Sequence, residues 1–224
     1  MYYTNEHLRD YQQEMKFRLF EEWGYHRNVM VQMPTGTGKT HLLAAIVREF
    51  LHGSHAPVWI VAHRRELVGQ IEETVARYGM GNDGGRTQEA GRVRVLSIQW
   101  LSRNGETMDE SPGLIVIDEA HHALAETYRA LWKRYPEARK LGMTATPCRL
   151  NGRGFTDLFD SLIISWTVEE FIGKGWLSSF DYVSIRADSR EQRLIDSLKK
   201  RGADGDYQVK EMNAVLNRET SIKG

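Results

Sequence analysis

The sequence predicts an α/β fold in which a parallel β-sheet is sandwiched between helices. Short apolar runs alternate along the chain with segments whose apolar residues recur at helical spacing. The runs at 58–62 and 114–118 are continuously apolar, as expected for strands that are buried on both faces. Strands that alternate with amphipathic helices in this way indicate βαβ units and therefore a parallel sheet.

The elements of this fold can be assigned in chain order, and no internal repeat or low-complexity segment interrupts them. An apolar stripe at helical spacing predicts an opening helix over 7–23. We expect strands at 29–33, 58–62, 93–98, 114–118, 140–144 and 162–166. Further helices are expected at 39–51, 67–78 and 120–135. The segment 79–92 contains five glycines and is predicted to be a flexible loop.

Length and composition place the chain among ordinary globular proteins. Its 224 residues suffice for one hydrophobic core, or for one core and the start of another. Because 30 basic residues balance 30 acidic ones, net charge predicts neither nucleic-acid nor membrane binding, and a nucleic-acid site must be a local patch. Cys148 is the only cysteine, which excludes an intramolecular disulfide. Since no signal peptide or membrane-spanning run is visible, we expect a cytoplasmic protein with no membrane partner.

The C-terminal part of the sequence has a different character. Thr167 and Glu170 match a capping box and predict a short helix, which the glycines after it close. Beyond residue 185 the chain is polar, and its helix-like segments have no visible partner core. We therefore expect residues 1–180 to form one domain and residues 181–224 to be a linker and the truncated start of a second domain.

The predicted strand at 29–33 is joined to the helix at 39–51 by a glycine-rich loop, Pro34-Thr35-Gly36-Thr37-Gly38-Lys39-Thr40. Glycines let such a loop fold tightly, so that its N–H groups converge on nucleotide phosphates. Lys39 supplies positive charge to the same phosphates, and the Thr40 hydroxyl can bind Mg²⁺. Met33 stands where the strict pattern has glycine. The alternative is a glycine-rich turn with an incidental Lys-Thr pair, but the flanking strand and helix favour nucleotide binding.

Two carboxylates, Asp118 and Glu119, come at the C-terminal end of the strand at 114–118. Ligands of open parallel sheets bind at that edge. A nucleotide held by a phosphate loop needs one carboxylate on the Mg²⁺ side and a second group that positions the attacking water. Asp118 suits the first role and Glu119 the second. The alternative is that these acids only decorate a helix N-terminus, which favours negative charge.

Several motifs together resemble those of superfamily 2 helicases of the DEAD/DEAH-box type. In chain order the similar segments are 8–12 (the adenine-reading motif), 33–40 (motif I), 61–67 (motif Ia), 96–99 (motif Ib or Ic), Asp118-Glu119-Ala120-His121 (the DEAH box) and Thr144-Ala145-Thr146-Pro147 (motif III). All six occur in the family's order and cover roughly residues 8–180. The segment 162–180 is similar to the DNA-repair and restriction-type branches.

The resemblance implies a RecA-like P-loop NTPase domain that uses ATP and Mg²⁺, and it assigns a role to each matching residue. The residues implied in catalysis are Glu119, Asp118 and Lys39. Those implied in ATP binding are Gln12, Arg9, Thr35, Gly36, Thr37, Gly38, Lys39 and Thr40, and those in Mg²⁺ binding are Thr40 and Asp118. The residues implied in coupling ATP to nucleic acid are His121, Thr144 and Thr146. Those implied in nucleic-acid contact are Arg64, Arg65, Ser97 and Gln99.

Some of these assignments have structural alternatives. Arg64 and Arg65 begin a predicted helix, where solvated arginines are common. Most of the tryptophans are expected to pack in the core, whereas Trp100 and Trp176 stay open between core packing and base stacking.

The function that the resemblance implies is that of an ATP-dependent helicase or translocase, of which this chain is the N-terminal ATP-binding domain. DNA is favoured over RNA as the track. A second RecA-like domain is expected to supply an arginine to the transition state, so the isolated chain is expected to hydrolyse ATP weakly. The alternative is an ATP-binding switch or assembly module without motor activity, which nucleic acid would not stimulate.

Overall fold

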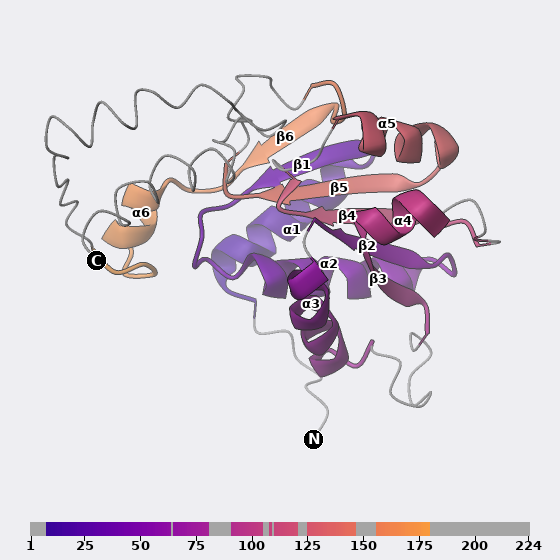
Figure 1. The fold of residues 1–224 in the computed structure, drawn as a ribbon. Helices are drawn as coiled ribbons and strands as arrows, with labels where there is room; N and C mark the ends of the chain where they lie inside the picture. The colour runs from indigo at the N-terminus through magenta and orange to yellow at the C-terminus, as the bar shows by residue number, and fades with distance from the viewer. Residues whose placement is uncertain are drawn as a thin grey trace, which may run out of the picture.

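The computed structural model describes residues 8–63, 65–80, 91–104, 108, 110–120, 125–146 and 156–179, except the side chains of 65, 66, 125 and 126. Within them, six strands form one sheet in which every pairing is parallel. In sheet order the strands are β3 (Val93–Ser97), β2 (Val58–Ala62), β4 (Leu114–Asp118), β5 (Arg139–Thr144), β1 (Asn28–Gln32) and β6 (Ser161–Ile164) (Figure 1). The predicted parallel α/β sheet is confirmed.

Helices cover both faces of this sheet (Figure 1). One face carries α1 (Asp10–Glu22), α2 (Lys39–Gly53) and α3 (Arg65–Arg77), and the other carries α4 (Ile98–Asn104) and α5 (Ala125–Arg134). The short helix α6 (Val168–Gly173) follows β6 beyond the edge of the sheet. None of the helices in the described part of the chain is long and apolar enough to cross a membrane.

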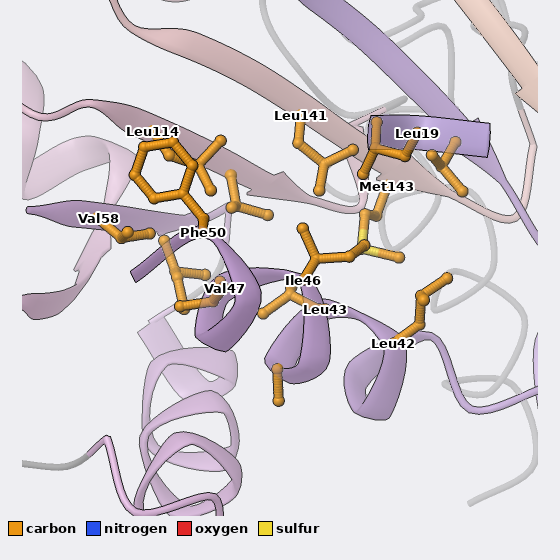
Figure 2. Close-up of a cluster of buried hydrophobic side chains, with 14 of the residues drawn as sticks. Leu19, Leu42, Leu43, Ile46, Val47, Phe50, Val58, Leu114, Leu141 and Met143 are labelled. Atoms are coloured by element: carbon orange, nitrogen blue, oxygen red, sulfur yellow. The ribbon is translucent and has the colours of Figure 1, made fainter. Parts of the chain in front are cut away.

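The strands direct alternate side chains into two hydrophobic clusters, which explains why their sequences are continuous apolar runs. In β2, Val58 and Ile60 pack in the cluster with α1, α2 and α3, whereas Trp59 and Val61 pack in the cluster with α4 and α5. Figure 2 shows the first cluster, where side chains of α2 meet those of the strands. Full burial of each such side chain stabilises the fold by roughly 1.5–3 kcal/mol.

Helix α4 differs from the sequence prediction, which extends the preceding strand to Ile98 and places no helix after it. Ile98 and Leu101 are both buried, at the spacing of one helical face. The Ser97 hydroxyl accepts a hydrogen bond from the backbone nitrogen of Trp100 (3.2 Å) and so caps the start of the helix. A helix of 7 residues directly after an apolar strand is too short to show its own periodicity.

Two other predictions fall partly on residues that the structure does not describe. The helix expected over 120–135 is observed as α5 from Ala125, and 121–124 lie outside the described residues. Most of the loop expected at 79–92 also lies outside them, at 81–90.

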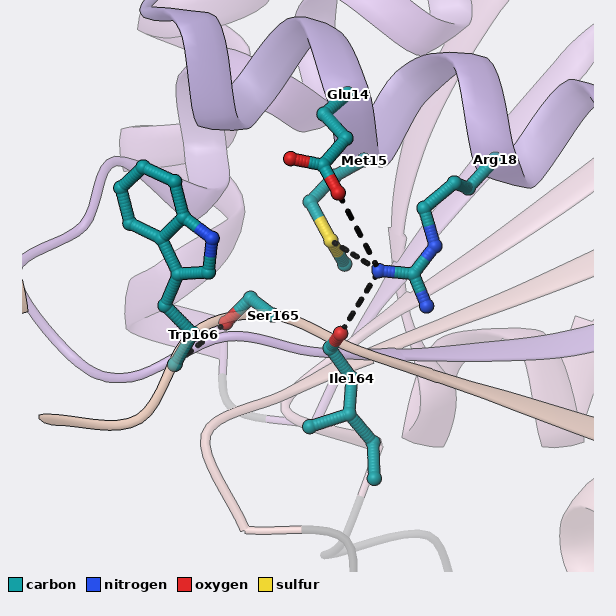
Figure 3. Close-up of polar contacts among 6 residues, drawn as sticks. All are labelled: Glu14, Met15, Arg18, Ile164, Ser165 and Trp166. Atoms are coloured by element: carbon teal, nitrogen blue, oxygen red, sulfur yellow. Dashed lines mark hydrogen bonds and ion pairs between the residues drawn. The ribbon is translucent and has the colours of Figure 1, made fainter. Parts of the chain in front are cut away.

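Helix α1 is fastened to the end of the edge strand β6 by Arg18 (Figure 3). The Nη1 atom of Arg18 donates to the carbonyl oxygen of Ile164 at 3.0 Å. The same atom lies 3.9 Å from the sulfur of Met15 and 3.9 Å from Oε1 of Glu14. Trp166, two residues further along, then packs its ring against Tyr11 at 5.5 Å between centroids. The start of α1 and the segment after β6 therefore share one region, although they are far apart in the sequence.

The predicted capping box at the start of α6 is confirmed. The hydroxyl of Thr167 accepts from the backbone nitrogen of Glu170 (3.2 Å), and the Glu170 carboxylate accepts from that of Thr167 (2.7 Å). Hydrogen bonds that Thr167 makes to the carboxylate, first from its backbone nitrogen and then from its side chain, lower the pKa of Glu170. Phe171 is fully buried, with its ring edge against Tyr11 at 4.9 Å, so α6 is docked on the first helix of the chain.

Gly142 in β5 is expected to tolerate no side chain. An added Cβ would lie 2.6 Å from Cζ of the buried Phe159 and 3.1 Å from Cβ of Ala120. We expect Gly142→Ala to lower the free energy of unfolding by about 1–3 kcal/mol, the usual cost of overpacking, in urea denaturation followed by circular dichroism. Gly69→Ala is the matched control, because a Cβ there meets no described atom within 4 Å inside α3. That control should raise the free energy of unfolding by about 0.5–1 kcal/mol, and equal stability of the two variants would contradict the packing argument.

Candidate functional site

The loop between β1 and α2 follows a path that only glycine adopts readily. Gly36 and Gly38 have φ angles of +84° and +79°, in the left-handed region, and Gly38 is the N-cap of α2. A Cβ on Gly38 would lie 2.6 Å from Nε2 of Gln12, and one on Gly36 would lie 3.1 Å from Cδ2 of Leu177. Both glycines are therefore required by the backbone path and by the side chains that pack against it.

Met33, at the position where the strict pattern has glycine, belongs to the core. Its side chain is fully buried, and its backbone nitrogen donates to the carbonyl oxygen of Thr144 at 2.9 Å. Nζ of Lys39 donates to the carbonyl oxygen of Met33 (3.3 Å), and the Thr37 hydroxyl donates to the carbonyl oxygen of Pro34 (2.7 Å). The loop is thus held by its own hydrogen bonds at the N-terminus of a helix, where anions bind favourably.

Residues of the predicted adenine motif brace this loop. Nε2 of Gln12 donates to the carbonyl oxygens of Thr37 (3.0 Å) and Gly38 (3.2 Å). The Tyr11 hydroxyl donates to the same carbonyl oxygen of Thr37 (3.0 Å). Arg9 donates through Nη1 to the Tyr11 hydroxyl (2.9 Å) and through its backbone nitrogen to Oε1 of Gln12 (3.0 Å). The start of α1 and the loop therefore form one hydrogen-bonded unit.

An aromatic cluster from the end of the described chain completes this unit, and sequence reasoning did not find it. The Arg9 guanidinium lies 4.7 Å from the ring centroid of Trp176, and that ring lies 5.6 Å from Tyr11. Trp176 is 41% exposed, so it packs at the rim and not in the core. The side chain of Leu177, in the same segment, packs against Gly36 of the loop. The sequence left Trp176 open between core packing and base stacking, and the capped helix before it does not indicate what the segment contacts.

The two carboxylates lie at the end of β4, as predicted. Burial raises the pKa of Asp118, and the neighbouring charge of Glu119 raises it further, whereas a backbone hydrogen bond at Glu119 and the charge of Lys39 act in the opposite direction. Glu119 has a φ of 51°, in the left-handed region that non-glycine residues seldom occupy. Such strain is concentrated at functional sites, where the surrounding structure maintains it.

These groups surround one cavity of about 660 Å³. Its lining includes every residue predicted to contact ATP or metal except Thr37, together with both carboxylates. The lining residues are Arg9, Gln12, Thr35, Gly36, Gly38, Lys39, Thr40, His41, Tyr78, Asp118 and Glu119. Thr37 belongs to the same loop but is only 1% exposed.

His41 and Tyr78 are members of this lining that the sequence did not indicate. Nδ1 of His41 and the Tyr78 hydroxyl lie 2.9 Å apart and share a hydrogen bond. His41 is in the first turn of α2, and Tyr78 directly follows α3. The sequence predicts these helices from the spacing of their core-facing residues. That spacing does not indicate that His41 and Tyr78 line a cavity.

Thr144 lies at the centre of this arrangement. It ends β5, which is hydrogen-bonded to β1 on one side and to β4 on the other. Its hydroxyl donates to the carbonyl oxygen of Thr146 (2.8 Å) and accepts from the backbone nitrogen of Thr146 (3.1 Å). Thr144 therefore contacts Met33, the residue directly before the glycine-rich loop, through its carbonyl, and the turn after β5 through its hydroxyl. His121 lies outside the described residues, so its coupling role stays a prediction.

Of the residues predicted to contact nucleic acid, Ser97 ends β3 and Gln99 follows it in α4, on the same edge of the sheet as the cavity. Ser97 caps α4, and Nε2 of Gln99 donates to the carbonyl oxygen of His63, directly after β2, at 2.8 Å. Arg64 lies outside the described residues, and Arg65 begins α3 with a side chain that is not described. All four roles stay predictions.

Comparisons with known proteins bear on the family. The ResIII family, described as "Type III restriction enzyme, res subunit", matches residues 5–149. A 51.5 kDa protein of a Lactococcus phage is 30% identical over 189 residues, which cover 84% of this chain and 38% of the phage protein. The DNA 3'-5' translocase XPB2 of Sulfurisphaera tokodaii is 27% identical over 210 residues, or 87% of this chain and 46% of that protein. This chain thus spans less than half the length of these relatives.

A solved structure confirms the fold. The helicase domain of Hef from Pyrococcus furiosus has a TM-score of 0.61 at 20% identity, over 97% of this chain and 54% of that one. The predicted RecA-like architecture and the resemblance to superfamily 2 helicases are both confirmed. With the family match over more than half of its length, the chain belongs to the ResIII family and contains a superfamily 2 helicase motor domain.

Proposed function

We propose that this chain is the ATP-binding first motor domain of an ATP-dependent DNA helicase or translocase. The observation that carries the proposal is a single cavity of about 660 Å³ that has a phosphate loop on one side and two carboxylates on the other. This volume is typical of cofactor and small-molecule sites, which measure roughly 300–1,000 Å³. The family description, a restriction-enzyme subunit, and the name of the archaeal relative, a DNA translocase, support the same function.

The groups in the cavity fit Mg²⁺ and ATP. The left-handed glycines let Gln12 and Leu177 pack directly on the loop backbone, and the backbone N–H groups of such a loop can approach phosphates. Thr40 and Asp118 would hold Mg²⁺, which binds proteins through few oxygen ligands and keeps phosphate oxygens and waters for the rest. When bound, Mg²⁺ would neutralise charge on the phosphates. Lys39 would add a positive charge to the same oxygens.

Glu119 is proposed to position or deprotonate the attacking water. It follows Asp118 directly, and its left-handed backbone sets it apart from the extended strand that presents Asp118. The two acids therefore have different surroundings, and the negative charge of Glu119 contributes, after burial, to the raised pKa of Asp118. A cation held by Asp118 would remove this cost, which favours one metal-binding and one water-positioning carboxylate.

Arg9 and Gln12 are proposed to recognise adenine. Arg9 is already oriented by the ring of Trp176 and the hydroxyl of Tyr11, so little side-chain entropy would be lost on binding. Gln12 donates to two carbonyls of the phosphate loop, so contact with the base would be transmitted directly to the residues around the phosphates. His41 and Tyr78 would form another wall of the same cavity.

The track is proposed to be DNA, contacted by Arg64, Arg65, Ser97 and Gln99 and coupled to ATP through Thr144, Thr146 and His121. We propose that residues 1–180 form the domain and that 181–224 lead into a second RecA-like domain, which supplies an arginine to the transition state. The isolated chain would then hydrolyse ATP slowly. A cytoplasmic location is consistent with action on DNA and with the single cysteine.

Glu119→Gln keeps the shape of the side chain and removes its charge. In the full-length protein that contains this chain, we expect ATP hydrolysis stimulated by DNA to fall about 10²–10⁴-fold, the usual contribution of a general base, with ATP affinity retained. Steady-state ATPase assays with single- and double-stranded DNA and RNA measure this effect. Glu72→Gln on the exposed side of α3 is the control and should change nothing. Hydrolysis by the unaltered protein that no polymer stimulates would favour a switch or assembly module instead.

Asp118→Asn should make the metal-free chain more stable at neutral pH. The raised folded-state pKa of Asp118 means that its ionised form is less favourable in the folded than in the unfolded chain. This penalty is absent below the ordinary pKa and complete once the pH exceeds the folded-state pKa. The gain in melting temperature should therefore shrink as the pH is lowered through that value. Thermal melts in EDTA across a pH series test this, and a variant less stable than the parent at neutral pH would refute it.

Trp176→Ala should weaken ATP binding because Arg9 loses the ring on which it is stacked. A cation–π contact at an exposed site contributes about 0.5–1 kcal/mol, so the dissociation constant for ATP should rise by about 2- to 5-fold. Isothermal titration with ATP and GTP measures the change, and the preference for ATP should shrink. Phe17→Ala, which removes an exposed aromatic ring from α1, is the control. If both variants bind ATP like the parent, the ring has no part in recognition of the base.

A further inference from the structure

A second cavity, of about 240 Å³, lies between α4 and α5. Its lining includes Ile98 and Gln99, which directly follow β3, and Ser102 and Arg103 further along α4. Thr127 and Tyr128 of α5 form the opposite wall. His63 directly follows β2, and Ile98 and Gln99 directly follow β3, so this part of the lining lies at the edge of the sheet where the strands end, on strands that are not next to β1 and its glycine-rich loop.

Tyr128 is the unusual member of this lining. The residue is 1% exposed, and its hydroxyl has no hydrogen-bond partner among the described residues. Burial raises the pKa of this hydroxyl, so it stays neutral at physiological pH. A buried hydroxyl without a partner costs about 1–3 kcal/mol, and a phenylalanine would fill the same space without that cost. A ligand in the cavity would supply the missing partner.

The chemistry of the lining restricts the ligand. The lining combines the apolar Ile98, the imidazole of His63, three residues with hydroxyl groups and the cation of Arg103; the hydroxyl-bearing residues are Ser102, Thr127 and Tyr128. This combination suits a flat ring with polar edges that is attached to an anionic group. The volume is below the roughly 300–1,000 Å³ of pockets for larger ligands, so one ring fits and a dinucleotide does not.

Trp100 extends this site along the surface. Its side chain is 44% exposed, and it stands three residues before Arg103, on the same face of α4. An exposed aromatic ring beside a cation is the arrangement on which single-stranded nucleic acids stack their bases. The neighbouring Gln99 is one of the residues already expected to meet the track.

We propose that the cavity between α4 and α5 receives one unpaired base of single-stranded DNA, with Tyr128 hydrogen-bonded to its edge, Arg103 at its phosphate and Trp100 stacked on the adjacent base. This inference rests on the proposed function, because it names where that function holds its track. A paired base is stacked inside the duplex and would first have to be unpaired and flipped out to enter the cavity, which is unfavourable. The site therefore selects single-stranded over double-stranded DNA.

Tyr128→Phe tests the proposal because it removes only the hydroxyl. The affinity of the 224-residue chain is measured by fluorescence anisotropy with a labelled single strand, an abasic strand of equal length and the duplex. We expect Tyr128→Phe to weaken binding of the intact single strand by about 3- to 10-fold, the effect of one hydrogen bond. Binding of the abasic strand and the duplex should be unchanged, and so should ATP hydrolysis without DNA. The melting temperature should be equal or higher, since an unpartnered polar group is removed from the interior.

Tyr135→Phe is the matched control. Tyr135 is also a buried tyrosine near the end of α5 whose hydroxyl has no partner among the described residues, but it packs on Trp59 outside this cavity. It should leave binding of every strand unchanged, whereas Trp100→Ala should weaken binding of the intact single strand alone.

The outcomes separate this inference from the proposed function. If the chain binds the single strand and Tyr128→Phe binds it equally well, the base site is overturned and the motor function stands. An equal loss of affinity for all three DNAs with a lowered melting temperature would mean a structural role for the hydroxyl and would also overturn the site. If the unaltered chain binds no DNA, and the full-length protein shows no stimulation of ATP hydrolysis by DNA, both proposals fail together.

Discussion

The carbonyl oxygen of Thr37 accepts hydrogen bonds from both Tyr11 and Gln12, and the proposed ATP site is arranged around this contact. The phosphate loop belongs to the sequence between β1 and α2, but its shape is maintained from α1. Gly38 must be glycine partly because the Gln12 amide occupies the space of its Cβ. Arg9, held by Tyr11 and Trp176, extends the same network to the rim. Loss of any of these donors would disturb the loop before any ligand is considered.

The order of the strands gives this local network its wider effect. Because β5 lies between β1 and β4, the phosphate loop and the carboxylates are not direct neighbours but are both adjacent to the end of β5. Thr144 accepts a hydrogen bond from the backbone nitrogen of Met33, directly before the loop, and bonds the following turn through its hydroxyl. Thr144 thus lies between the two sides of the cavity, a position compatible with the coupling role proposed for it.

The sequence predicted the sheet, the phosphate loop and the acidic pair because each has a local pattern that burial or backbone geometry requires. Continuous apolar runs mark strands that are covered on both faces, and the spacing of Gly36 and Gly38 marks a left-handed path. The contacts of Trp176 and Tyr78 could not be predicted, because they join segments distant in the chain without any periodicity. Helix α4 was missed for a different reason: its first residue continues the apolar run of β3, and its cap, Ser97, is the last residue of that strand.

The contact between Leu177 and the phosphate loop has a mechanical consequence. Gly36 has no side chain, and the methyl group of Leu177 fills the space where one would stand. Leu177 belongs to the segment after α6, and this segment is held on α1 by the contacts of Phe171 and Trp176 with Tyr11. A displacement of the segment would therefore change the space available to the loop that is proposed to hold phosphates, and by reciprocity a ligand on that loop would shift the segment. The short stretch from Phe171 to Leu177 thus links the position of α6 to the shape of the loop.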